Sequence, residues 1–178
     1  MDKYPHPSLL RLLFLGDVVG EPGRKAVASF IPLMREDRGV NFVVVNGENS
    51  AGGRGITPKI AIGLLRAGAT VITTGDHIWD QREIIDFLPT EPRLLRPVNY
   101  PDGTPGNGSI VLETEKGPVA VINAQGRTFM NNPLENPLIS IDNELKKIRK
   151  DLDVKMVFLD FHAEATSEKI ATGRYLDG

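Results

Sequence analysis

The chain alternates short apolar runs with polar, glycine-containing loops and with stretches in which apolar residues recur at helical spacing. The apolar runs are too short for helices and rich in branched residues, so they predict strands. These runs are Leu12–Leu15, Phe42–Asn46, Thr70–Thr73 and Met156–Asp160. Helices are expected at about 24–37, 58–68 and 81–88, then around 141–148 and up to about residue 176. Strands that alternate with helices in this way are typical of a largely parallel sheet.

Two further apolar runs do not follow this alternation of strands and helices. Ser109–Glu113 and Val119–Asn123 are joined by TEKGP, which predicts an antiparallel hairpin, and the preceding segment 89–108 is a loop dense in proline, glycine and asparagine. We therefore expect an α/β, layered fold with a mixed, largely parallel sheet flanked by helices. We see no internal repeat and no linker, so residues 1–178 are expected to form a single domain.

Composition narrows the possible functions. The 178 residues carry a formal net charge of −2, which gives no general reason to bind nucleic acid or an anionic membrane. The chain has no cysteine, which excludes disulfides and thiol chemistry. No apolar run approaches the length of a membrane span, and Asp17 interrupts the N-terminal apolar patch, so we expect no membrane partner and a cytoplasmic protein.

Polar side chains gather where the predicted strands end. Ligands of open α/β sheets bind beyond the carboxyl ends of the strands. The candidates there are Asp17, Glu48, Asn49, Asp76, His77, Asn123, Gln125, Arg127, Asp160, His162 and Glu164. Several carboxylates at one sheet edge repel one another unless cations lie between them. Carboxylate, amide and imidazole ligands suit Mn, Fe or Zn better than Ca.

Each candidate also has a purely structural interpretation. Asp17 could cap the following helix, and a lone histidine such as His77 is more often a core residue that donates to a carbonyl. For Asp80 we favour an N-cap role in the next helix. Arg54 and Arg127 could contact phosphate or lie solvated on the surface. The chain has neither a G-x-S-x-G nucleophile motif nor a P-loop.

The motifs resemble those of a known family. The order strand–GD, strand–GEN and strand–GDH resembles a divergent calcineurin-like metallophosphoesterase. More narrowly, GDVVGEPGR, NGENSAGG, INAQGRTFM and FLDFHAEATSEK resemble the YmdB-like metallophosphoesterases over essentially the whole chain. The resemblance implies a two-metal phosphodiesterase that acts on 2′,3′-cyclic nucleotides or on a phosphodiester at an RNA end. The metals are expected to be Fe or Mn, with Zn or Mg as alternatives.

The same resemblance implies a role for each matching residue. Asp17 would bind the first metal, Glu48 would bridge the two, and Asp76 and His162 would bind the second. Asn49 would orient the phosphate or the bridging hydroxide, and His77 would be the general acid. Attack by a metal-bridging hydroxide that expels the 2′ oxygen would give a 3′-nucleotide. Arg127 is retained as a candidate phosphate contact.

The chain departs from the family pattern at two places. The family continues with a G-x-H-x-H segment that supplies further metal ligands, so we expect a C-terminally truncated form covering the N-terminal two-thirds of the family domain. An exposed sheet edge would then invite pairing with another chain, and a homo-oligomer is expected. The second departure is Asp76, where the family usually has asparagine. Two alternatives stay open: an inactive domain that binds nucleotide, RNA or a protein, and a phosphomonoesterase.

Overall fold

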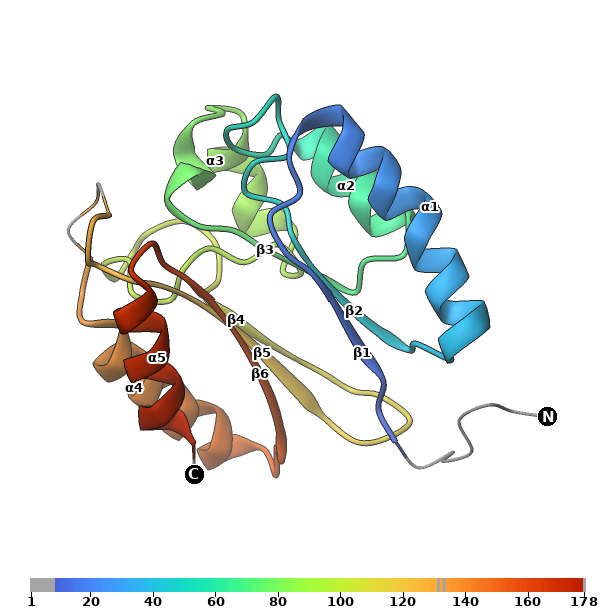
Figure 1. The fold of residues 1–178 in the computed structure, drawn as a ribbon. Coiled ribbons are helices and arrows are strands. Elements are labelled where there is room, and N and C mark those ends of the chain that lie inside the picture. Colours follow the sequence, from blue (N-terminus) through green and yellow to red (C-terminus); the bar gives the residue numbers. More distant parts are fainter. Residues whose placement is uncertain (1–8, 131, 133, 178) are drawn as a thin grey trace.

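The strands form two stacked sheets in the part of the chain that the computed structural model describes, residues 9–130, 132 and 134–177 (Figure 1). The first sheet is parallel throughout and has the order β1-β2-β3. The second has the order β4-β5-β6, in which β4 and β5 are antiparallel and β5 and β6 are parallel. The strands are β1 (Leu12–Leu15), β2 (Phe42–Asn46), β3 (Val71–Thr73), β4 (Ser109–Leu112), β5 (Val119–Gln125) and β6 (Met156–His162).

Helices cover the outer faces of both sheets, so the layers run helix, sheet, sheet, helix (Figure 1). Those beside the first sheet are α1 (Gly20–Arg38), α2 (Pro58–Arg66) and the short α3 (Ile84–Phe87), with 3-10 turns η1 (Asp76–Trp79) and η2 (Leu88–Thr90). Those beside the second are α4 (Pro137–Asp151) and α5 (Thr166–Leu176). Thr57 caps α2 by accepting a hydrogen bond from the backbone N–H of Ile60, and a proline follows at the first helical position, as the sequence predicts.

The predicted α/β class with parallel and mixed sheets is confirmed, and the strands are divided between two sheets. The connection between them is the segment 89–108, which bridges β3 at Ile72–Leu94 and then leads into β4. One local prediction was wrong. Asp80 does not cap α3, because the chain after β3 first forms η1 and the helix begins only at Ile84.

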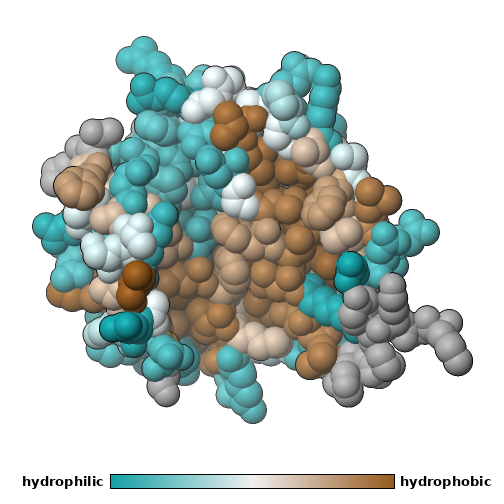
Figure 2. Space-filling view, in the orientation of Figure 1, coloured by the Kyte–Doolittle hydropathy of each residue, from teal (hydrophilic) through white to brown (hydrophobic). Residues whose placement is uncertain are grey.

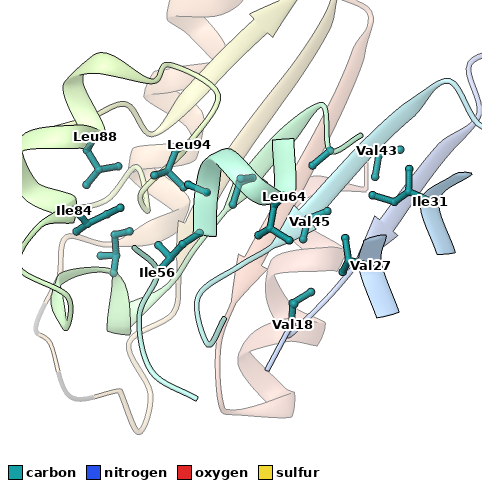
Figure 3. Close-up of a cluster of buried hydrophobic side chains, with 14 residues drawn as sticks. Val18, Val27, Ile31, Val43, Val45, Ile56, Leu64, Ile84, Leu88 and Leu94 are labelled. Carbon is teal, nitrogen blue, oxygen red and sulfur yellow. The ribbon is translucent and has the colours of Figure 1, made fainter. Parts of the chain in front are cut away.

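The main core lies between the first sheet and its helices (Figure 3). Strand β2 is buried along its whole length, because helices cover one face and the second sheet covers the other. Val43 and Val45 face the helices, where they pack with Val27 and Ile31 of α1. Val44 points the other way, into a smaller cluster between the sheets that includes Val121. The continuous valine run of β2 is thus explained by burial on both faces.

A buried polar seam joins the two sheets near their carboxyl ends. Asp160 of β6 accepts hydrogen bonds from Asn46 Nδ2 at 2.9 Å and from Thr73 Oγ1 at 2.5 Å. Asn123 of β5 exchanges two hydrogen bonds with the backbone of Thr74, at 2.9 and 3.0 Å. Because these side chains are buried and paired, the seam fixes how the ends of β2 and β3 lie against those of β5 and β6.

The outer strands β1 and β6 lie at the margins of their sheets. Figure 2 shows apolar side chains gathered over this region, where Phe14 and Phe158 pack with their ring centroids 5.3 Å apart. Among the described helices, none combines the length and apolar character that crossing a bilayer requires.

Candidate metal centre

Two carboxylates and an imidazole from three strand ends converge at the top of the polar seam. Glu48 follows β2, Asp76 follows β3, and His162 ends β6. His162 lies between the acids, with Nδ1 3.0 Å from Glu48 Oε2 and Nε2 3.1 Å from Asp76 Oδ1. Both sheets therefore contribute to one cluster, as the positions of these residues at strand ends predict.

The backbone around Gly75 makes this convergence possible. A β-carbon at Gly75 would collide with the Glu48 carboxylate and would lie 2.5 Å from His162 Cδ2. The chain then enters η1, whose first residues present Asp76 and His77. The backbone N–H of His77 donates to Glu48 Oε1 at 3.1 Å, so it anchors the buried carboxylate through the oxygen that does not contact His162.

Burial and the neighbouring charges have opposite effects on the pKa values of the residues in this cluster. Burial favours the neutral imidazole, but the hydrogen-bond and charge interactions with Glu48 and then Asp76 outweigh it and raise the pKa of His162 to about 9. Burial raises the pKa of the Glu48 carboxyl, against the opposing effect of His162. Burial also favours the neutral form of Asp76, but its contacts with Glu48, His77 and His162 lower its pKa. The imidazolium thus offsets the negative charge of the acids.

His77 faces the cluster on one side and Asp80 on the other. A nitrogen of His77 lies within 4.8 Å of carboxylate oxygens of Glu48 and Asp76, and these three residues form a group able to hold a metal ion. His77 Nδ1 lies 3.3 Å from Asp80 Oδ2, and Asp80 also accepts a hydrogen bond from Arg54 Nε at 2.9 Å. Sequence reasoning missed this pairing, although H-x-x-D spacing brings both side chains to one side of a 3-10 turn.

Asn49 links the cluster to Asp17. Its Nδ2 donates to Asp17 Oδ1 at 2.9 Å, while its buried Oδ1 has no hydrogen-bond partner among the described residues. Asp17 itself is exposed and adopts a positive φ of 49°. Helix α1 begins after Val19 without a side-chain cap, so Asp17 does not serve as the N-cap.

A pocket of about 570 Å³ opens over the cluster. Its lining includes Glu48, Asn49, Asp76, His77 and His162, together with Phe129 and Met130 from the loop after β5. Arg127 lies outside this pocket and lines a neighbouring one of about 600 Å³, in which Met130 also takes part. The structure thus gathers five of the predicted site residues, links Asp17 to them through Asn49, and places Arg127 beside them.

The residues present fit a hard or borderline divalent cation. Asn49 Oδ1 is a buried oxygen without a hydrogen bond within the described part of the chain, and an unpaired buried acceptor is costly unless something binds it. Glu48 Oε2 is paired with His162 Nδ1, at 3.0 Å. Carboxylate, amide and imidazole groups without any thiolate are the donor set of Mn, Fe or Zn sites. The cluster therefore has ligands that a divalent cation could use, and Asn49 Oδ1 is available as an additional oxygen ligand.

Two stacked sheets with acidic and histidine side chains at their strand ends are the arrangement expected of the metallophosphoesterase class, which the sequence motifs resemble. A crystal structure of a hypothetical protein from Thermus thermophilus superposes with a TM-score of 0.86 at 38% identity, covering 94% of this chain and 64% of that one. The crystal structure of a novel phosphatase from Mycoplasma pneumoniae gives a TM-score of 0.86 at 30% identity, covering 95% and 60%.

The family model of YmdB-like proteins matches residues 13–178, and the chain belongs to this family. It is 46% identical over 169 residues to the 2′,3′-cyclic-nucleotide 2′-phosphodiesterase of Bacillus subtilis strain 168, covering 95% of this chain and 63% of that protein. The chain thus spans less than two-thirds of the length of these relatives. The family resemblance drawn from the sequence motifs is confirmed.

Proposed function

We propose that this protein forms the catalytic part of a two-metal hydrolase that cleaves phosphodiesters, with 2′,3′-cyclic nucleotides as substrates and 3′-nucleotides as products. The observation that carries the proposal is the convergence of Glu48, Asp76 and His162 beside His77 in one pocket. The activity named for the Bacillus subtilis relative supports the substrate class.

In this proposal Asp17 would hold one metal ion, Asp76 and His162 would hold the other, and Glu48 would contribute to both. Fe or Mn suits these ligands, and Zn or Mg are the alternatives. When bound, the cations supply Lewis acidity, which activates water and neutralises charge on the attacked phosphoryl group. Asp76 acts as an anionic ligand, which we expect to bind metal more tightly than the asparagine usual in the family.

The chain's own residues orient the substrate and move the proton. His77 delivers a proton to the departing ribose oxygen, because its ring faces the pocket while Asp80 contacts Nδ1. That contact leaves Nε2 for the leaving group and fixes the orientation of the ring. Asn49 lines the pocket and orients the phosphate. Arg127 lines the neighbouring pocket and is the candidate for a further phosphate contact through its guanidinium group.

The test combines elemental analysis with hydrolysis of 2′,3′-cyclic AMP by the protein at its natural length. Glu48→Gln should lose bound metal and at least about 100-fold in kcat/KM, because removing a ligand charge weakens the site. Glu36→Gln, an exposed acid on α1, is the matched control and should leave both unchanged. Full metal content and activity in Glu48→Gln would contradict the proposal. A preference for a phosphomonoester over the cyclic diester would replace it with a phosphomonoesterase.

A further inference from the structure

Phe129 occupies an unusual position on the rim of the candidate metal pocket. Its side chain is 86% exposed, the largest exposed fraction among the described large apolar residues. It also adopts a φ of 64°, in the left-handed region that glycine or asparagine normally occupies. Exposure and strain are both unfavourable for phenylalanine. A residue that is costly in two ways at a binding site points to a function.

The turn that carries Phe129 is firmly attached to the site. Met130 N donates to Arg127 O at 3.3 Å, which closes a turn with Phe129 at its third position. Glu168 of α5 accepts hydrogen bonds from the backbone N–H groups of Arg127 and Thr128 at 2.8 and 3.2 Å. The preceding Gly126 N donates to the carbonyl of His162 at 2.8 Å. The ring is thus presented by an anchored turn tied to a candidate metal ligand.

The pocket floor and its rim have different chemistry. The floor carries Glu48, Asp76 and the two histidines, which suit a phosphate bound through cations. The rim carries the exposed ring of Phe129 beside Met130. A ligand that uses both would join a phosphate to a flat apolar group. Nucleotides have this chemistry, and exposed aromatic rings stack on bases with little dependence on base identity.

We propose that Phe129 is a base-stacking platform that makes the site selective for phosphodiesters carrying a nucleobase. The inference rests on the proposed function, and it adds the part of the substrate that the metal cluster does not contact. Stacking without hydrogen bonds to the base edge predicts broad acceptance of nucleobases, with purines favoured over pyrimidines because they offer more stacking area.

The experiment uses the natural-length protein loaded with Mn²⁺ and two probes, 3′-AMP and inorganic phosphate. Phe129→Ala should weaken 3′-AMP binding about tenfold in calorimetry and leave phosphate binding unchanged. Phe129→Tyr should retain binding, whereas Phe129→Leu, which is apolar but not aromatic, should behave like alanine. Phe30→Ala, an exposed aromatic on α1 outside the pocket, is the matched control.

A second measurement separates stacking from a structural role. Phe129→Gly should weaken 3′-AMP binding while thermal stability stays equal or rises, because glycine relieves the positive φ. Loss of stability and binding together would overturn the inference. Unchanged 3′-AMP binding in Phe129→Ala would also overturn the inference. This includes a result in which that variant changes only the oligomeric state.

Failure of the inference is distinguishable from failure of the proposed function. If Phe129→Ala and the unmodified protein hydrolyse 2′,3′-cyclic AMP with the same KM, the platform is refuted and the hydrolase stands. If neither protein hydrolyses it, the proposed function fails. The 3′-AMP titration then still decides the stacking role.

Discussion

Replacing Gly75 by alanine adds one methyl group at the point where the two sheets meet in the candidate metal centre. The new β-carbon would lie 2.5 Å from His162 Cδ2 and still closer to the Glu48 carboxylate, whereas ordinary contact begins at 3.4 Å. The imidazole must therefore move by about 1 Å, and a displacement of about 1 Å in a catalytic constellation costs about 100-fold in rate. The φ of −158° at Gly75 lies outside the left-handed region, so the expected effect comes from the collision.

The assay measures Mn²⁺ affinity, kcat/KM for 2′,3′-cyclic AMP and the free energy of unfolding in the natural-length protein. We expect at least tenfold weaker Mn²⁺ binding, about 100-fold lower kcat/KM and a loss of about 1–3 kcal/mol in stability from overpacking. Gly63→Ala is the matched control. Gly63 lies inside α2, and no atom of the described residues outside the backbone of that helix lies within 4 Å of the added β-carbon, so the substitution should raise stability by about 0.5–1 kcal/mol.

Two results would refute the reasoning. If Gly75→Ala binds Mn²⁺ with unchanged affinity and keeps kcat/KM within threefold, the close approach of Glu48 and His162 to the backbone is not needed for the site. If Gly63→Ala shows the same losses as Gly75→Ala, the effect belongs to any added methyl group and not to the cluster. A folded Gly75→Ala, checked by circular dichroism, is required for either comparison.

Three further outcomes are expected. The pKa of His162 is raised to about 9, so a metal ion that binds its imidazole must displace a proton. Mn²⁺ affinity should therefore rise up to tenfold per pH unit from pH 7 and level off near pH 9. A Mn²⁺ affinity that does not change with pH in calorimetry would contradict this. Asp80→Asn should lower kcat for 2′,3′-cyclic AMP about 10–100-fold and leave the metal content unchanged. The loss should be smaller for bis-p-nitrophenyl phosphate, because its leaving group needs no proton. Equal losses for the two substrates would exclude a role of Asp80 in orienting His77. Asp160→Ala should cost about 2–3 kcal/mol in urea unfolding, because its two buried donors lose their acceptor, and a loss below about 0.5 kcal/mol would remove the seam as a stabilising feature.

The elements of the fold were largely predictable, because each local signal is strong. Strands β1 and β2 have the predicted bounds, since each apolar run is bounded by polar residues or glycine. The division into two sheets was not predictable in this way. It depends on the path of segment 89–108, whose isolated bridges at Leu94 and Leu95 leave no periodic pattern.

The convergence of the candidate residues was predictable from the sequence, but their contacts were not. Strand ends and family motifs indicated Glu48, Asp76 and His162 because chemistry collects at such ends. The contact between His77 and Asp80 depends on a 3-10 turn where the sequence favoured a helix cap. The strained φ of Phe129 depends on tertiary anchoring through Glu168, which no local pattern reveals.

The polar seam and the cluster above it have a consequence for cooperativity. Glu48 and Asp76 extend from the first sheet and His162 from the second, so any cation shared among them binds only when the sheets are docked. Because the metal binds only the docked form, it raises the free energy needed to separate the two sheets. The increase is about 2.7 kcal/mol when free metal is 100 times its dissociation constant. A chelator titration followed by amide hydrogen exchange would read this linkage directly, as faster exchange along β6 and β2 together. The stability of the fold would thus depend on the metal concentration, whether or not the protein is hydrolysing substrate.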